Sequence, residues 1–480
     1  MIYLIGEYSV FNRDAAIYGV KKLFDKNDIE AQIITPTMDI KHQRNRAARL
    51  SAFEVGTIWS IYDRFTGRYI QEEKLLTPQN FEAPEGFVAQ AGFNSLRYIN
   101  ADDSLELKLR GDGSIEAVEH LENGELTQRD NYDDGGRLVT IEYPLGEDTH
   151  TKIVDAQGEV VFELYQTGIY KKVVKIKFLP TNQDFLSEEM FWEWAFEQLV
   201  TNKFPEDKFF IMNERFRRAI ATSNFSKYDV YLLPTEPFNE AQSRDILFDH
   251  FEKLIFNSHD ELNKIAKHFD EKTTSKLFWN NYIATDKISS NFDVKTFPIY
   301  LNLGRESEAV NFQEVLKFVS ETLQEEQQVS FVVEFSLLRD QVNFLAGLKA
   351  LNFTDEIIKE RVQAMTRPFP ETRSDAIAKS VLYIHYQNPE IISAGLMDAI
   401  SAEKPILALG GNPLLNDYVN DSNGKIISNA SVTRLIKQVL YDVEFIKFVS
   451  PNPEAMREKF SEKQTMARWN KIFSDEGRKI

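Results

Sequence analysis

The chain has 480 residues, of which 42% are hydrophobic and 27% are charged, a composition typical of a soluble globular protein. Because this length exceeds what one compact core accommodates, we expect two or three domains. The formal net charge of −18 argues against nucleic acid or an anionic membrane as the main partner. The absence of cysteine excludes disulfides, thiol catalysis and cysteine metal sites, and fits a reducing cytoplasm.

The N-terminal sequence MIYLIGEYSVFNRD has a short apolar run and no basic segment before it. It therefore predicts a buried strand and not a signal peptide. No run reaches the roughly 18 apolar residues that a membrane-spanning helix needs. We expect a cytoplasmic protein.

An α/β unit opens the chain. Apolar runs at 2–6 and 31–35 flank a segment with helical periodicity at 13–24, a pattern typical of a βαβ unit. Residues 45–65 have a helical pattern, and residues 75–87, which contain two prolines, indicate connecting chain.

The pattern changes to period-2 alternation between Leu96 and Tyr165. Turn signals with glycine separate the alternating runs at spacings of 11, 12 and 22 residues, namely Gly113, Gly124, Gly136 and Gly158. Such spacing predicts an antiparallel meander, which we interpret as an insertion in the first α/β domain. Because both faces carry polar residues, we expect this sheet to be half exposed.

After Val173 the α/β pattern returns. A helix is expected from Ser187, with Trp192 and Trp194 in the core, and another after Ser258. We expect short buried strands at 208–212, 229–234 and 253–257.

From about residue 291, strands and helices alternate regularly. The strands are predicted at 297–303, 328–335, 380–387 and 405–410, and the helices at 311–326, 340–351, 389–402 and 429–440. Residues 452–473 predict one basic helix that packs back on the first domain.

The sequence therefore predicts an α/β protein with two Rossmann-type, doubly wound domains and an inserted antiparallel β-meander. The first domain is expected to combine 1–92 with 176–290, joined by the helix within 456–480. The meander is expected at 93–175 and the second domain at 291–455. Ligands of such folds bind outside the carboxyl ends of the strands, which here would face a cleft.

Two segments of the second domain resemble the donor domain of the family-four, GT-B-fold glycosyltransferases. In that family a strand ends in Gly-Arg with a Lys shortly after, and a later helix opens with Glu-x7-Glu and interior glycines. Here LNLGRESEAV supplies Gly304 and Arg305, and NPEIISAGLMDAISAEKP supplies Glu390 and Asp398 at the spacing of the two acids. The later segment GGNPLLNDYVNDSNGKII also resembles the family, with Gly410, Gly411 and Gly424 in place.

The same segments lack part of the donor motif. No Lys follows Arg305 within eleven positions, and Ile391 and Ser393 stand where the family has glycines. A diphosphate needs bare backbone N–H groups and a cation, so these losses favour a protein without glycosyl transfer. The alternative interpretation is that Glu390 is an acid favoured at a helix N-terminus and that Arg305 ends a strand.

The candidate sugar- or nucleotide-binding residues are Gly304, Arg305, Glu390, Ser393 and Asp398. We assign no catalytic residue, no metal site and no cofactor. The seven histidines form no pair at metal-ligand spacing. For His385, on a predicted strand, a core position is favoured over a general base.

Most of the chain resembles the accessory Sec secretion proteins of the Asp-one type. The resemblance rests on the order of the α/β unit, the meander GSIEAVEHLENGELTQRDNYDDGGRL, the strand end YLNLGRES, and DAISAEKPILAL followed by NDYVNDSNGKIIS. It implies a GT-B-like, non-catalytic component of a dedicated export system in Gram-positive bacteria. Its implied partners are companion accessory Sec proteins, the accessory SecA-type motor and a glycosylated serine-rich-repeat adhesin, with carbohydrate and the inner membrane face as further contacts.

Two alternatives stay open. The same meander occurs in related active enzymes that glycosylate adhesins or teichoic acid. The chain could therefore be an active retaining GT-B glycosyltransferase, or the non-catalytic partner that binds the acceptor for such an enzyme.

Overall fold

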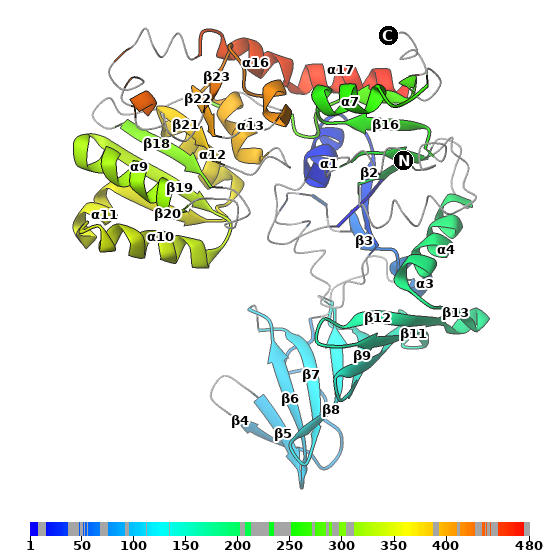
Figure 1. Ribbon diagram of the computed structural model, residues 1–480. Coiled ribbons are helices and arrows are strands. Elements are labelled where there is room, and N and C mark those ends of the chain that lie inside the picture. The colour runs from blue at the N-terminus through cyan, green and yellow to red at the C-terminus, as the bar shows by residue number, and fades with distance from the viewer. Residues whose placement is uncertain are drawn as a thin grey trace. The chain divides into compact units, whose positions relative to one another are not determined.

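The computed structural model of the chain (Figure 1) contains two parallel sheets and one antiparallel sheet. It describes residues 1–7, 16–36, 48, 51, 53–54, 56–67, 75–91, 96–111, 113–133, 135–201, 207–212, 230–234, 251–270, 274–284, 288–289, 297–303, 312–386, 393–409, 413–427, 434–436, 438, 442 and 450–474. The chain forms two compact units, Met1–Val10 with Asp28–Leu232 and Asp249–Glu252, and Phe11–Asn27 with Leu233–Phe248 and Lys253–Ile480. The division into domains given above stays a prediction.

The predicted βαβ opening is confirmed. β1 (Ile2–Ile5) pairs in parallel with β2 (Ala31–Thr35) and with β14 (Lys208–Ile211), and α1 (Ala16–Lys26) connects the first two strands. The strands belong to a seven-stranded sheet of order β17-β16-β15-β14-β1-β2-β3. Its other members are β3 (Ile58–Ser60), β15 (Val230–Leu232), β16 (Lys253–Phe256) and β17 (Leu277–Trp279).

The helix predicted over 45–65 is wrong for the described residues between 53 and 62, none of which is helical. Residues 58–60 form β3, which pairs in parallel with β2, and all three of its side chains are buried. Only the short helix α3 (Asp63–Thr66) follows, and it ends at Gly67, whose φ is 63°. The β-branched and aromatic residues Ile58 and Trp59 suit a strand that is buried on both faces.

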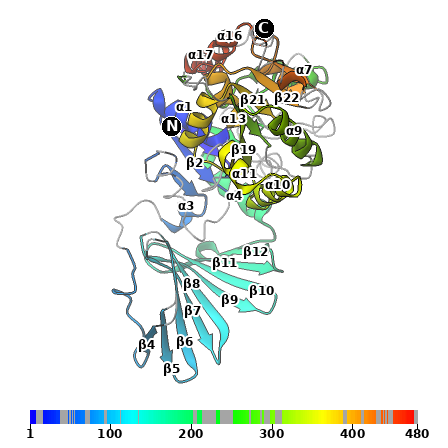
Figure 2. The ribbon, with the colours of Figure 1, turned by 90° about the vertical axis from the view of Figure 1, so that its left-hand side faces the viewer.

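The predicted antiparallel meander is a ten-stranded sheet in which each strand pairs with the next in sequence (Figure 2). The strands are β4 (Val88–Ala91), β5 (Leu96–Asn100), β6 (Asp103–Leu109), β7 (Ile115–Glu122), β8 (Glu125–Tyr132), β9 (Leu138–Leu145), β10 (Asp148–Val154), β11 (Val160–Thr167), β12 (Lys172–Phe178) and β13 (Gln183–Phe185).

Glycines with positive φ occupy its turns, as the spacing predicts. The four predicted turn glycines have φ between 76° and 90°. Gly146, with φ of 69°, lies in the turn between β9 and β10 and accounts for the doubled interval between Gly136 and Gly158. Glycine adopts this conformation without the steric cost that other residues meet.

One end of this sheet packs against the helix predicted from Ser187. In α4 (Glu188–Thr201), the Phe191 ring centroid is 5.5 Å from that of Phe162 on β11, and the Trp194 centroid is 5.2 Å from that of Phe178 on β12. Trp192 is 1% exposed, which confirms it as a core residue. Aromatic packing therefore covers one face of the last strands of the meander.

The second α/β series forms a six-stranded parallel sheet of order β20-β19-β18-β21-β22-β23. Its direction of growth reverses between β18 and β21, which makes this pair the topological switch point. The strands are β18 (Phe297–Asn302), β19 (Val329–Phe335), β20 (Val362–Thr366), β21 (Leu382–His385), β22 (Ile406–Leu409) and β23 (Gly424–Ile427).

Helices cover both faces of this sheet (Figure 1). One core contains residues of α9 (Phe312–Glu325), α10 (Leu338–Ala350) and α11 (Asp355–Arg361). The other contains residues of α12 (Pro370–Lys379) and α13 (Ala394–Ser401). The described strands and helices of the predicted series are confirmed, whereas β20, α11 and α12 were not predicted.

The single C-terminal helix predicted over 452–473 is wrong. The segment forms α16 (Pro453–Lys459) and α17 (Glu462–Phe473), because Phe460 is fully buried between them and the Ser461 hydroxyl accepts a hydrogen bond from Gln464 N. Trp469 of α17 packs against Phe24 of α1, with ring centroids 5.2 Å apart.

Candidate functional site

The candidate site lies at the carboxyl ends of β18 and β21, the switch point of the six-stranded sheet. Asn302 and His385 end these strands and stand opposite each other in the parallel register. The Asn302 side chain donates a hydrogen bond to the Tyr383 hydroxyl at 3.0 Å, and Tyr386 N donates to the Asn302 carbonyl at 2.8 Å. The polar groups at this end of the sheet are thus bonded to one another.

Side chains cap the first turn of α13 and pack against one side of it. Ser393 caps the helix, since its Oγ accepts a hydrogen bond from Leu396 N at 3.1 Å, and it also hydrogen-bonds Tyr383. A Cβ at Gly395 would lie 2.8 Å from Asn302 Nδ2 and 3.0 Å from the Tyr383 hydroxyl. Glycine at 395 therefore serves close packing inside the protein. A diphosphate would need this helix start to be open.

Asp398, the second acid of the predicted motif, holds a buried cation. Arg373 Nε donates to Asp398 Oδ2 at 2.8 Å, and the Ser374 hydroxyl donates to the same oxygen at 2.9 Å. Arg373 comes from α12 and is 3% exposed. Because a buried guanidinium needs a counter-ion, this carboxylate has a structural role that competes with binding sugar hydroxyls.

The other predicted site residues are placed as follows. Gly304, Arg305 and Glu390 lie outside the described residues, as do Ile391, Gly410 and Gly411. Gly424 begins β23, and a Cβ there would lie 2.3 Å from the Ile406 carbonyl oxygen. This glycine is therefore required by strand pairing.

His385 is a core histidine, as predicted. The side chain is 1% exposed and its ring stacks on Tyr383 with centroids 6.1 Å apart. Burial lowers its pKa from 6.5 to about 4, because desolvation disfavours the charged ring. A neutral ring without solvent access is not placed to act as a general base.

Sequence reasoning missed three residues that shape this site: Arg373, Tyr383 and Asn302. Asn302 and Tyr383 lie in the predicted strands 297–303 and 380–387. Because ligands of such folds bind at the carboxyl ends of the strands, this rule could have indicated both residues. Arg373 lies in a helix of mostly polar composition, so nothing in the pattern distinguishes it from an exposed arginine.

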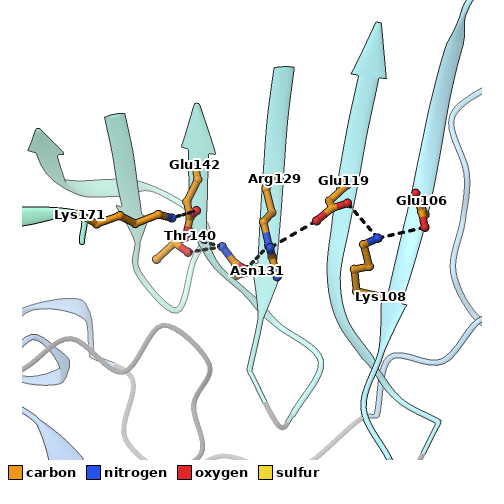
Figure 3. A network of polar contacts seen from close by, with 8 residues as sticks. All are labelled: Glu106, Lys108, Glu119, Arg129, Asn131, Thr140, Glu142 and Lys171. Carbon is orange, nitrogen blue, oxygen red and sulfur yellow. Dashed lines mark hydrogen bonds and ion pairs between the residues drawn. The ribbon is translucent and has the colours of Figure 1, made fainter. Parts of the chain in front are cut away.

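A second polar feature crosses one face of the ten-stranded sheet (Figure 3). Glu106, Glu119, Arg129 and Glu142 stand opposite one another on β6, β7, β8 and β9. We call the whole set the charged ladder: Glu106, Lys108, Glu119, Arg129, Asn131, Thr140, Glu142 and Lys171.

The charges of the ladder pair within strand β6, between neighbouring strands, and with Lys171 in the turn between β11 and β12. Lys108 Nζ lies 3.0 Å from Glu106 and 3.1 Å from Glu119, and Arg129 lies 3.3 Å from Glu119. Lys171 Nζ lies 2.6 Å from Glu142. The two pairs between neighbouring strands, Lys108 with Glu119 and Arg129 with Glu119, each contribute about 0.2–1 kcal/mol to a face that carries polar groups in place of an apolar core.

Within the described part of the chain, no group of three or more His, Asp or Glu side chains could hold a metal ion. Over the same residues, no helix combines the length and the apolar character needed to cross a membrane.

Three solved structures share this fold over nearly the whole chain. The accessory secretory protein 1, 2 and 3 structure from Streptococcus pneumoniae matches with a TM-score of 0.73 at 12% identity, over 100% of this chain and 99% of that chain. The GtfA/B complex matches with a TM-score of 0.74 at 13% identity, over 100% and 99%. The pneumococcal O-GlcNAc transferase GtfA in complex with UDP and GlcNAc matches with 0.73 at 16%, over 99% and 98%.

No family model matches the sequence, and no curated protein matches it. At 12% to 16% identity the three structures show the fold alone. The predicted fold is confirmed: the chain has a GT-B-like α/β fold with an antiparallel β-meander. The predicted resemblance to the accessory Sec proteins is confirmed at the level of the fold.

Proposed function

We propose that the chain is a non-catalytic accessory component of a dedicated Sec export system. It binds a glycosylated serine-rich-repeat adhesin and companion accessory proteins on a degenerate glycosyltransferase-like scaffold. The fold that it shares with the accessory secretory proteins of Streptococcus pneumoniae supports this proposal.

The observation that carries the proposal is the state of the donor motif. Asp398 is the counter-ion of the buried Arg373, and the first turn of α13 packs against Tyr383 and Asn302. Both the acid and the helix start that a sugar nucleotide needs are thereby engaged within the protein. The missing Lys after Arg305 removes a cation for the leaving diphosphate.

The partners follow from the same comparison. Two of the similar structures contain more than one kind of protein, accessory secretory proteins 1, 2 and 3 in one and GtfA with GtfB in the other. We propose companion accessory proteins as partners of this chain as well, with the SecA-type motor, at the cytoplasmic face of the membrane.

An active retaining glycosyltransferase is the second candidate. It is favoured by the fold shared with the O-GlcNAc transferase that binds UDP and GlcNAc, and by Asp398, which stands at the second acid of the motif. A non-catalytic partner that presents the acceptor to such an enzyme is the third, favoured by the fold shared with the GtfA/B complex.

The proposal is tested by binding to an adhesin fragment. The purified chain is immobilised, and a serine-rich-repeat fragment is passed over it with and without its sugars and with and without the companion proteins. We expect the glycosylated fragment to bind, at least tenfold more tightly when the companions are present. The fragment without sugars is the matched control.

Two results would count against this role. If neither form of the fragment binds in any combination, the chain does not hold the adhesin. If UDP-N-acetylglucosamine leads to sugar on the unmodified fragment in the presence of this chain alone, the enzyme candidate replaces the proposal.

A further inference from the structure

The two edges of the ten-stranded sheet differ in how they are protected. β13 is three residues long, its Asp184 forms an ion pair with Lys175 at 2.9 Å, and α4 follows directly. β4 ends the sheet on the other side and pairs only with β5 in the described strand order. A short, charged strand next to a helix resists further pairing, so the β13 edge is the protected one.

The β4 edge is nearly as short as β13 but carries no charge, proline or bulge. Its four residues, Val88-Ala89-Gln90-Ala91, include no charge and no proline, and their register with β5 contains no bulge. Val88 is 70% exposed. Uncharged, regular edge strands present backbone N–H and C=O groups to which another strand can bind.

The segment that precedes β4 packs on the same sheet. Residues 75–87 form no helix or strand but pack on the sheet, where Phe81 and Tyr98 have ring centroids 5.5 Å apart and Ile115 N donates to the Leu76 carbonyl at 2.8 Å. Phe87 packs against an apolar cluster of β6 and β7 that includes Leu107 and Ile115. A strand that is already ordered loses little conformational entropy when a partner binds.

We propose that β4 receives an extended, uncharged polypeptide segment as an eleventh strand of this sheet. The proposal rests on the proposed function, in which that segment belongs to the exported adhesin. The new strand would run beside Ala89 on one face. On the other face it would run beside Gln90. Gln90 stands opposite Arg97 of β5, and Arg97 stands opposite Glu106 of the charged ladder.

The side chains at the edge define the chemistry of the segment. Small residues fit beside Ala89, and hydroxyl groups suit the face of Gln90, where the charged ladder already pairs its own charges. Four exposed carboxylates lie close to the Val88 end of the strand in structure or in sequence: Asp102 and Asp103 at the turn after β5, whose Ile99 pairs with Val88, and Glu82 and Glu85 in the segment before β4. They disfavour an acidic segment and a second copy of this acidic chain, and favour serine, threonine and alanine.

The test uses a labelled synthetic peptide of repeating Ser-Ala-Thr-Ala and the full chain. We expect binding by fluorescence anisotropy and slower hydrogen exchange at 88–91. Ala89→Lys with Gln90→Lys, which places charges on the edge, is expected to weaken binding at least tenfold. Gln183→Lys on β13 is the matched control and is expected to bind as the unchanged chain does.

Several results would overturn the proposal. These are equal binding by the β4 variant, protection elsewhere than at 88–91, equal binding of an acidic Ser-Glu-Thr-Glu peptide, or a dimer that the β4 variant abolishes. If the peptide does not bind but the glycosylated adhesin fragment does, this proposal fails and the proposed function stands. Circular dichroism of each variant checks that the sheet is intact.

Discussion

Replacing Arg373 with alanine is expected to lower the free energy of unfolding by about 3–5 kcal/mol, the usual cost of breaking a buried ion pair. The substitution removes a guanidinium that is 3% exposed and leaves Asp398 without the donor at 2.8 Å. It also opens a space beside Gly395, whose Cβ position is 3.5 Å from Arg373 Cδ. Urea denaturation followed by circular dichroism measures the change.

The matched control lies on the same helix. Lys379 and Asp375 form an exposed pair at 2.6 Å, with side chains 59% and 63% exposed. Lys379→Ala should change the free energy of unfolding by at most about 0.5 kcal/mol. A loss below about 1 kcal/mol for Arg373→Ala would mean that Asp398 does not depend on this pair and is available to a ligand.

Removing the imidazole of His385 is expected to flatten the acid side of the stability profile. The folded-state pKa is about 4 and the unfolded value is near 6.5, so the unfolded chain binds more protons as the pH falls below 6.5. Stability that is present above pH 6.5 is therefore lost as the pH falls toward 4. Between pH 7 and pH 5 this loss amounts to about 2 kcal/mol.

The comparison is made between pH profiles, because His385→Phe also changes packing at every pH. The free energy of unfolding of the unchanged chain should fall by about 2 kcal/mol more than that of the variant between pH 7 and pH 5. His268→Gln, at an exposed position, is the control and should keep the full slope. If the free energy of unfolding of His385→Phe and that of the unchanged chain depend on pH in the same way, protonation of the buried ring does not destabilise the fold.

The strands could be predicted because each sheet has its own sequence period. Apolar runs such as 297–303 predict buried parallel strands, and alternation with glycine predicts the meander. The interval between Gly136 and Gly158 shows why glycine spacing alone is incomplete: Gly146 also has positive φ, at 69°. The meander therefore has at least one more glycine turn than the four that the spacing predicts.

The errors have local causes. Residues 58–60 continue an amphipathic pattern, but parallel pairing with β2 makes them a strand, so tertiary contacts override helical periodicity. At the C-terminus Ser461 acts as an N-cap inside an otherwise helical pattern and divides it into α16 and α17.

The sequence located two of the candidate residues in the fold, and their binding of a sugar or nucleotide stays a prediction. Ser393 and Asp398 lie at the start and in the middle of α13, next to the switch point, as the motif requires. Their contacts with Tyr383 and Arg373 could not be predicted, because they join segments that are distant in sequence. Sequence spacing thus indicates where a donor motif lies, whereas only tertiary contacts show that its groups are engaged within the protein.

The most direct measurement is release of UDP from UDP-N-acetylglucosamine by the purified chain, with and without the adhesin fragment, together with calorimetry of UDP itself. With the first turn of α13 packed against Asn302 and Tyr383, and with Asp398 paired to Arg373, the chain is expected to bind UDP no tighter than millimolar and to release no UDP above the blank. Steady UDP release that depends on the fragment and is lost in Asp398→Ala would contradict the account.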